Sequence, residues 1–352
     1  MTTDFLIIGH GIAGVCMFEH LVASGKKCLI INEEKAFSSS KVAAGLYNPI
    51  TGRKMNETWL AEALFPYLLD FYMQLEKKLQ TNFLINKPIY RPFASIEDQN
   101  DWLGKSSGKS TFVTATYTTP QYGEFIDDKY GGILLNNAGF INLKSLLKSH
   151  STYLLNEKLY HAAKFDYRKL NFRGSTFEYD TIKAKHLIFC DGPLSSNPYF
   201  NWVPTAPVKG EILHIKTAKE LPEHVIFNKG VFIIKDTDND YYRVGSTYNW
   251  RKLDTVPTEE ARLQLEQKLR ELLKIPFEVV DQVAGIRPAS KDRKPLIGAH
   301  PEISNMYTFN GLGTKGVSLA PYFAKSLTDN IIYNKDLQDE VNISRYNSLY
   351  LA

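Results

Sequence analysis

Long hydrophobic runs are missing from this sequence. No apolar stretch among its 352 residues reaches the roughly 18 to 20 residues that a helix needs to cross a bilayer. The first residues show no basic leader followed by an apolar segment, so we expect a cytoplasmic protein without a membrane span. Dense Lys/Arg blocks, internal repeats and low-complexity tracts are also absent, and the formal net charge is only +4. The charge pattern therefore gives little support for nucleic-acid binding and leaves that question open.

Cysteine is scarce. The three cysteines, Cys16, Cys28 and Cys190, lie in or beside apolar strand or helix patterns. Such positions are typical of reduced thiols in a core, and their spacing matches no common zinc site. We expect neither a disulfide nor a bound metal ion.

The first 34 residues contain a glycine-rich turn between two apolar strands. An apolar strand at residues 5–8 runs into the turn, a helical stretch follows, and residues 28–31 form a second apolar strand. Gly9 permits the tight turn, Gly11 lets a pyrophosphate approach the backbone, and Gly14 lets the helix pack closely on the strand. The phosphates would lie at the helix N-terminus, where unpaired N–H groups favour negative charge. This pattern predicts a βαβ dinucleotide-binding unit.

The rest of the chain alternates between helical and strand-rich segments. Leucines and Phe71 recur at spacings of three and four from Leu60 to Leu79, which predicts a long amphipathic helix. Residues 89–133 are rich in Thr, Tyr and Gly and are interpreted as antiparallel strands. A second strand-rich segment follows residue 207, with Thr258 as the predicted N-cap of the helix after it.

This order predicts an α/β protein of two discontinuous domains. A dinucleotide-binding domain would comprise residues 1–85, 140–206 and 285–352. An α+β substrate domain, built on an antiparallel sheet, would comprise residues 86–139 and 207–284. We expect the ligand between the two domains.

Five segments together resemble the FAD-dependent oxidoreductases of the D-amino-acid oxidase superfamily, which includes glycine oxidase and sarcosine oxidase. They are residues 9–14, 39–46, 207–213, 284–288 with 292–298, and 311–316. The second and last segments are also similar to the flavin-dependent half of the bifunctional enzyme that matures 5-methylaminomethyl-2-thiouridine in tRNA. The resemblance implies a discontinuous Rossmann-type FAD-binding domain. None of the three cysteines lies where the sarcosine oxidases attach their flavin, so we expect FAD bound without a covalent link.

The resemblance also implies which residues contact FAD. Short side chains between Ser38 and Gly45 let backbone and hydroxyl donors reach a pyrophosphate or the isoalloxazine edge. The residues assigned to cofactor binding are Gly9, Gly11, Ile12, Ala13, Gly14, Asn32, Glu33, Ser39, Ser40, Lys41, Ala43, Ala44, Gly45, Leu46, Cys190, Gly192, Gly311, Leu312, Gly313, Thr314, Lys315 and Gly316.

The end of the second strand departs from the family pattern. An acidic residue there binds the adenosine ribose in the family, but the matching position in this chain is Asn32. Its amide oxygen can still accept a ribose hydroxyl, or Glu33 can take over that contact. A solvated strand end is the plain alternative.

Arg287 is the first of two candidate catalytic residues. A guanidinium in an otherwise apolar strand is costly to bury unless an anion meets it, and its planar fork suits a carboxylate. An internal salt bridge is the alternative, whereas the resemblance implies that Arg287 binds the substrate carboxylate.

Lys315 is the second candidate. It lies at the start of a predicted helix, where a cation is unfavourable by about 0.3 to 1 kcal/mol. The resemblance places this helix end at the flavin pyrimidine, where positive charge stabilises developing negative charge. Exposure of the ammonium group to water is the alternative, and Thr314 stands where glycine oxidase has a second arginine.

Aromatic positions differ from the family as well. Phe227 and Phe232 stand in the region where D-amino-acid oxidases present tyrosines, which predicts a more apolar pocket. Tyr241, Tyr242, Tyr248 and Trp250 are candidates to line it, although each is also typical of a packed strand. His10 is interpreted as a loop side chain rather than a catalytic base.

The sequence thus predicts FAD-dependent oxidation of a small amine or amino acid, with O2 or another electron acceptor. Demodification of carboxymethylaminomethyl-uridine in tRNA is the alternative among enzymes. A flavin-bound sensor without turnover is the alternative outside them.

Overall fold

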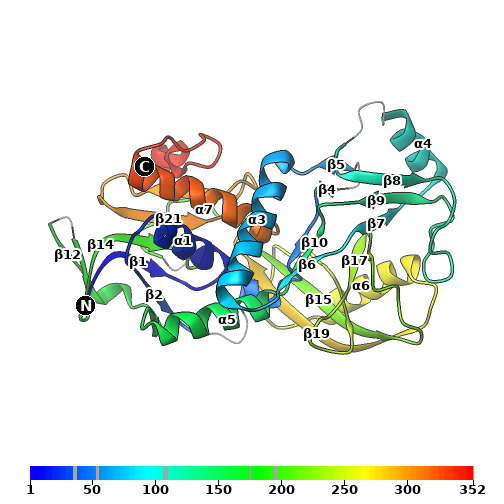
Figure 1. Cartoon of the computed structure of the whole chain (residues 1–352), viewed down its shortest axis with the longest axis horizontal. Helices are drawn as coiled ribbons and strands as arrows, with labels where there is room; N and C mark the ends of the chain where they lie inside the picture. The colour runs from blue at the N-terminus through cyan, green and yellow to red at the C-terminus, as the bar shows by residue number, and fades with distance from the viewer. Residues whose placement is uncertain (35–37, 53–54, 106–109, 175, 194–196, 352) are drawn as a thin grey trace.

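The computed structural model describes residues 1–34, 38–52, 55–105, 110–174, 176–193 and 197–351. Two lobes lie side by side, and helix α3 (Ala61–Leu79) crosses the junction between them (Figure 1). Both chain ends belong to the lobe drawn on the left, which we call the first lobe. Among the described residues, no helix is both long and apolar enough to cross a lipid bilayer.

The first lobe is built on a mostly parallel sheet. Its central strands run in the order β11-β2-β1-β14, and β1 pairs in parallel with both β2 and β14. Strand β21 continues the parallel order beside β14. The strands are β1 (Thr2–Ile8), β2 (Cys28–Asn32), β11 (Tyr160–Ala162), β12 (Leu170–Arg173), β13 (Thr176–Tyr179), β14 (Ile182–Phe189), β20 (Leu296–Ala299) and β21 (Met306–Asn310).

Both faces of this sheet are covered, which explains why its strands are apolar without alternation. Phe5 and Ile7 face a core shared with α1 (Ile12–Ala23), α3, α5 (Leu143–Asn156) and α7 (Gly316–Tyr333). Leu6 and Ile8 face the opposite core, which is rich in aromatic side chains. The predicted βαβ unit is therefore present.

The second lobe contains an eight-stranded sheet in the order β19-β15-β18-β17-β16-β7-β9-β8. All of its pairings are antiparallel except that of β16 with β7. Helix α6 (Glu259–Leu272) packs on this sheet, and its N-cap is Thr258, as predicted. The strands are β7 (Ile89–Pro92), β8 (Val113–Tyr117), β9 (Gly132–Leu135), β15 (Val208–Thr217), β16 (Ile226–Lys229), β17 (Val231–Lys235), β18 (Tyr242–Gly245) and β19 (Phe277–Arg287).

Short elements join the lobes. Strand β10 (Gly139–Ile141) pairs with β3 (Leu46–Tyr47) and with β6 (Leu84–Asn86). The remaining elements are α2 (Ser39–Val42), β4 (Ile50–Thr51), β5 (Asn56–Glu57), η1 (Tyr167–Lys169), η3 (Ile343–Tyr346) and α8 (Asn347–Tyr350).

The interpretation of residues 89–133 as strands alone was wrong. Helix α4 (Ile96–Lys105) interrupts them. Ser95 Oγ accepts the Asp98 N–H at 3.2 Å, and the Asp98 carboxylate accepts the Ala94 N–H at 3.0 Å. This reciprocal pattern caps a helix, and it is legible in the sequence as Ser followed three residues later by an acid.

Candidate active site

A single cavity of about 2810 Å³ brings most of the predicted site residues together. It is lined by residues of both lobes, and its volume exceeds the roughly 300 to 1,000 Å³ of an ordinary small-molecule site. Arg287, Lys315 and every predicted cofactor residue except Gly14 line this cavity. The space therefore accommodates an extended ligand together with a second, smaller one.

The glycine turn forms one end of the cavity. Gly9 has φ of +107°, and a Cβ there would collide with the Cys190 carbonyl oxygen. A Cβ on Gly14 would collide with the Gly9 carbonyl oxygen, which explains why Gly14 packs against the strand instead of lining the cavity. Gly11 caps α1 without a side-chain hydrogen bond, so the helix N-terminus can accept an anion.

The loop of small residues after β2 meets the glycine turn. Ser40 Oγ accepts the Ile12 N–H at 3.1 Å, and the Ser39 hydroxyl donates to the Ile286 carbonyl. Gly45 has φ of +71°, and a Cβ there would collide with the Ile141 carbonyl oxygen. The loop is therefore held between the two lobes with its short side chains in the cavity wall.

Arg287 ends strand β19 in the cavity wall. Its Nη1 donates to the Thr247 carbonyl at 3.0 Å, and its Nη2 donates to Ser246 Oγ at 2.8 Å. The Tyr248 ring centre lies 4.5 Å from the guanidinium carbon. On the neighbouring strand β15, Gly210 leaves the space that the guanidinium occupies, because any Cβ there would collide with it.

No carboxylate of the described chain lies within salt-bridge distance of Arg287, so the predicted alternative of an internal ion pair is not found there. Burial lowers the pKa of Arg287. A largely buried cation without an anionic partner favours binding of an anion from outside.

Lys315 is the N-cap of α7 and faces the same cavity. Its Nζ lies 3.4 Å from Thr58 Oγ1, and burial lowers its pKa. The ammonium group is half-buried in the cavity wall rather than extended into open solvent.

Comparison with known proteins identifies the family. A family model described as FAD dependent oxidoreductase (DAO) matches residues 4–330. The chain belongs to this family. The FAD-dependent oxidoreductase is 22% identical to the glycine oxidase of Pseudomonas aeruginosa, over 94% of both chains.

Two further relatives are informative. The glycine oxidase structure from Geobacillus kaustophilus matches this FAD-dependent oxidoreductase with a TM-score of 0.74 at 17% identity, covering 96% of both chains. The tRNA 5-methylaminomethyl-2-thiouridine biosynthesis bifunctional protein of Legionella pneumophila is 22% identical over 84% of this chain and 45% of its own length. The predicted fold class, superfamily and cofactor are confirmed.

The residues present fit FAD. A glycine turn at an uncapped helix N-terminus suits a pyrophosphate, and the small-residue loop leaves room for a flat ring system. Which residue contacts which part of FAD remains our proposal.

Asn32 makes two hydrogen bonds within the protein. Its Oδ1 accepts the His10 N–H at 3.0 Å, and its Nδ2 donates to the Tyr160 hydroxyl at 2.8 Å. The amide therefore positions the glycine turn. Glu33 lines the cavity beside it.

Asp191 is a site residue that the sequence reasoning missed. It follows Cys190 at the end of β14, lines the cavity, and accepts hydrogen bonds from the Tyr167 hydroxyl and from Asn197 Nδ2. Burial raises the pKa of Asp191 to about 6, although these hydrogen bonds oppose the shift. The sequence could have indicated this role, because Asp191 lies between a buried strand and Gly192.

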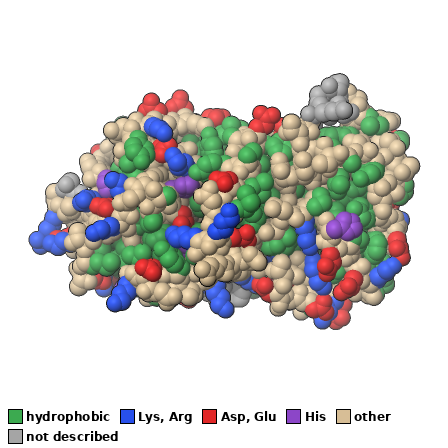
Figure 2. Space-filling model, in the orientation of Figure 1, with side chains coloured by type: hydrophobic (Ala, Val, Ile, Leu, Met, Phe, Trp, Pro, Cys, Tyr) green, Lys and Arg blue, Asp and Glu red, His purple; other side chains and the backbone are tan. Residues whose placement is uncertain are grey.

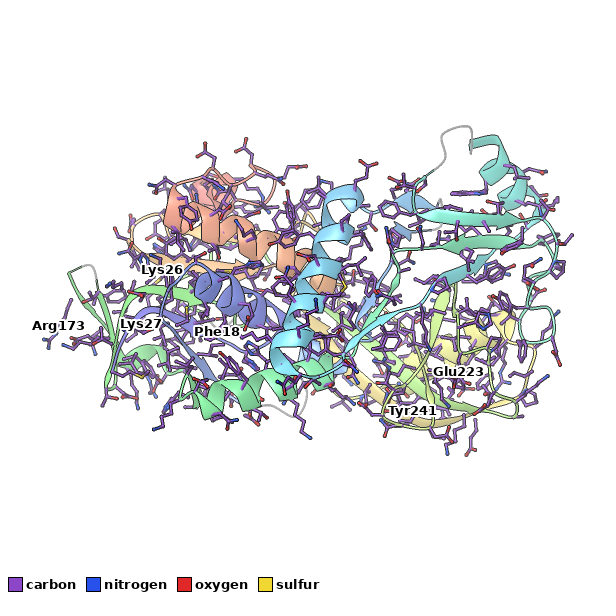
Figure 3. The ribbon with its side chains drawn as sticks, viewed as in Figure 1. Phe18, Lys26, Lys27, Arg173, Glu223 and Tyr241 are labelled. Atoms are coloured by element: carbon purple, nitrogen blue, oxygen red, sulfur yellow. The ribbon has the colours of Figure 1, made fainter. Side chains whose placement is uncertain are left out.

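The aromatic predictions are divided. Phe232 lines the cavity, whereas Phe227 packs in the core of the second lobe. Tyr241 and Tyr242 do not line the cavity. Tyr241 stacks on His214 with ring centres 4.3 Å apart, near the outer edge of the second lobe (Figure 3).

Tyr248 and Trp250 do line the cavity, on the loop between β18 and α6. Their rings are nearly parallel with centres 6.1 Å apart, and they are 52% and 59% exposed. Two exposed aromatic rings therefore stand at the mouth of the cavity, next to Arg287.

Proposed function

We propose that this flavoenzyme oxidises a small amine or amino acid that carries a carboxylate, of the glycine, N-alkylglycine or D-amino-acid type. The observation that carries the proposal is the Arg287 guanidinium, which is oriented by Ser246 and Thr247 and has no carboxylate partner in the described chain. The similarity to glycine oxidase supports the same substrate class.

The residues of the chain would position the reaction. FAD, when bound, accepts at N5 the hydride that leaves the carbon next to the substrate nitrogen. Arg287 binds the carboxylate through two parallel hydrogen bonds and so fixes the orientation of that carbon. The apolar side chain of Phe232 in the cavity wall limits water.

No dedicated base is required when the substrate amine enters in its neutral form. Lys315 supplies positive charge in the cavity wall, where it favours the accumulation of negative charge. The imine product then hydrolyses in water, and O2 or another acceptor removes the electrons.

Demodification of carboxymethylaminomethyl-uridine in tRNA is the second candidate. Tyr248 and Trp250 present exposed aromatic faces, and the exposed Arg251 and Lys252 follow them in the chain. Aromatic faces stack on bases, and cations neutralise phosphates. The carboxymethyl group also ends in a carboxylate that Arg287 would bind.

The surface charge favours the small-molecule proposal. On the face shown in Figure 2, Lys and Arg side chains are interspersed with Asp and Glu rather than gathered into a stripe. A steep loss of tRNA binding with added salt would support the second candidate.

An anaerobic titration tests the two candidates. The flavin absorbance near 450 nm is followed while glycine, sarcosine, D-alanine, D-proline and a carboxymethylaminomethyl-uridine tRNA are added in turn. Bleaching by a free amino acid supports the first proposal and ranks its substrates, whereas bleaching by the tRNA alone supports the second. Bound FAD that none of them reduces would contradict both.

A further inference from the structure

A chain of one partly buried glutamate and two buried histidines leads from the surface of the first lobe to the glycine turn. His10 Nε2 lies 2.8 Å from His150 Nδ1, and His150 Nε2 lies 3.0 Å from Glu19 Oε1. His150 is fully buried and His10 is 7% exposed. Phe18, labelled in Figure 3, packs edge-on against His150 with ring centres 5.5 Å apart.

The outer end of this chain is electrically neutral. Lys78 Nζ lies 2.8 Å from both carboxylate oxygens of Glu19. Burial by itself raises the pKa of Glu19, but the contacts with His150 and Lys78 lower it overall. The carboxylate is therefore ionised and paired with the Lys78 ammonium group.

This arrangement fixes the tautomers of both histidines. An ionised carboxylate only accepts hydrogen bonds, so His150 Nε2 carries a hydrogen, and in the neutral imidazole His150 Nδ1 is an acceptor. His10 Nε2 must then donate, which leaves His10 Nδ1 with a free lone pair. Burial, and to a smaller extent the Lys41 charge, lowers the pKa of His10, consistent with a neutral ring.

His10 lines the cavity, and no hydrogen bond joins its Nδ1 to another described residue. The ring lies among the residues at the end of β2. Tyr160 contacts it edge-on with ring centres 5.3 Å apart, and Asn32 holds both the His10 N–H and the Tyr160 hydroxyl. This is the region where the family binds the adenosine ribose, and the Asn32 oxygen there already accepts one hydrogen bond, from the His10 N–H.

We propose that His10 is the ribose-binding residue of this enzyme: its Nδ1 accepts a hydroxyl of the adenosine ribose in place of the missing acidic side chain. His150 and Glu19 are positioning residues that hold the required tautomer. The proposal concerns only the adenosine half of FAD and is independent of the substrate that the enzyme oxidises.

ADP and its 2′-deoxy and 3′-deoxy forms are suitable probes, because they carry the adenosine half without the flavin. Their affinity for the apoprotein is measured by calorimetry for the parent chain and for His10→Phe. We expect His10→Phe to weaken ADP binding about tenfold, the usual effect of one lost hydrogen bond in a site. The parent chain and His10→Phe should have equal affinity for the deoxy form that lacks the hydroxyl bound by His10.

Two matched variants serve as controls. His186→Phe makes the same substitution on β14 outside the cavity, against Phe5, and should leave ADP affinity unchanged. Glu19→Leu, which removes the acceptor for His150 Nε2, should weaken ADP binding by a few fold in the parent but not in the His10→Phe background, because both substitutions act through His10 Nδ1. This coupling is a readout that a loss of general stability does not produce.

Three results would overturn the proposal. One is unchanged ADP affinity in His10→Phe. Another is an equal loss for ADP and for both deoxy forms, which would indicate a contact with phosphate. In the third, Glu33→Ala binds ADP and its deoxy forms with equal affinity, whereas His10→Phe still binds ADP more tightly. That result would assign the ribose contact to Glu33.

Discussion

Arg287 is the residue on which substrate binding is expected to depend. Its guanidinium lies in a site without a neighbouring carboxylate, so a bound carboxylate would be its anionic partner. Removing one partner of a buried charge pair costs about 2 to 5 kcal/mol.

Arg287→Ala is therefore expected to raise the substrate KM a hundredfold or more while FAD absorbance stays intact. Arg287→Lys should recover part of the loss, because the ammonium keeps the charge but not the planar fork. Steady-state kinetics measure both, with Arg270→Ala on the exposed side of α6 as the control. Unchanged kinetics would remove Arg287 from the substrate site.

Asp191 is expected to make stability depend on pH. Its pKa is about 6 in the folded chain and 3.8 in the reference state, so the unfolded chain releases its proton first as the pH rises. The contribution of this group to stability is greatest below about pH 4 and is lost between pH 4 and 6.

Asp191→Asn removes this loss. The difference in unfolding free energy between Asp191→Asn and the parent should rise by about 1 to 2 kcal/mol between pH 4 and 6 and stay constant above pH 6. Solvent in the cavity keeps this difference below the value for a fully buried carboxyl group. Urea unfolding of the two apoproteins at several pH values measures the difference. A difference that is independent of pH would contradict the assignment.

At the scale of elements, two glycines of the same turn should behave differently. Gly14 lies where α1 packs on the turn, and a Cβ there would collide with the Gly9 carbonyl oxygen. Gly11 faces the cavity, and its Cβ would meet only Ser40 Oγ, at 3.1 Å.

Gly14→Ala should therefore lower the stability of the apoprotein by about 1 to 3 kcal/mol as well as its FAD affinity. Gly11→Ala should weaken FAD binding at least tenfold with little change in apoprotein stability, since within the chain its methyl group meets only the Ser40 side chain, which can shift. Gly104→Ala, which meets no atom within 4 Å, is the control. Equal effects of Gly11→Ala and Gly14→Ala on apoprotein stability would contradict this distinction.

Strand β15 supplies a second prediction at this scale. Gly210→Ala places a methyl group where the Arg287 guanidinium lies, so the arginine must move. We expect the KM of Gly210→Ala to rise as in Arg287→Ala, while its kcat changes less than its KM. The spectrum of the bound flavin should be preserved. Loss of FAD from Gly210→Ala would show that the strand affects the whole cavity instead.

At the scale of the whole molecule, the cavity is lined by both lobes, so FAD should stabilise the chain as a unit. A ligand at one hundred times its Kd adds about 2.7 kcal/mol to the free energy of unfolding. Thermal unfolding at several FAD concentrations should show one transition that moves upward. Two transitions, only one of which responds to FAD, would indicate lobes that unfold separately.

How far the sequence predicts this molecule depends on the distance between the interacting residues. The βαβ unit was predictable because its glycines, apolar strands and helix are neighbours in the chain. The helix α3 and the N-cap Thr258 were predictable for the same reason. Helix α4 was missed because few apolar residues mark it, and its signal was the capping pair of Ser95 and Asp98.

The sequence by itself determined that a dinucleotide-binding unit is present and which loops carry small side chains, because these depend on local backbone requirements. Only the tertiary structure decided that Asn32 bonds to His10, that Gly210 makes room for Arg287, and that Glu19, His150 and His10 form one chain. These contacts join residues that are up to 140 positions apart in the sequence, the separation between His10 and His150. Their partners are fixed by the packing of α1, α5 and the two sheets, which no local pattern specifies.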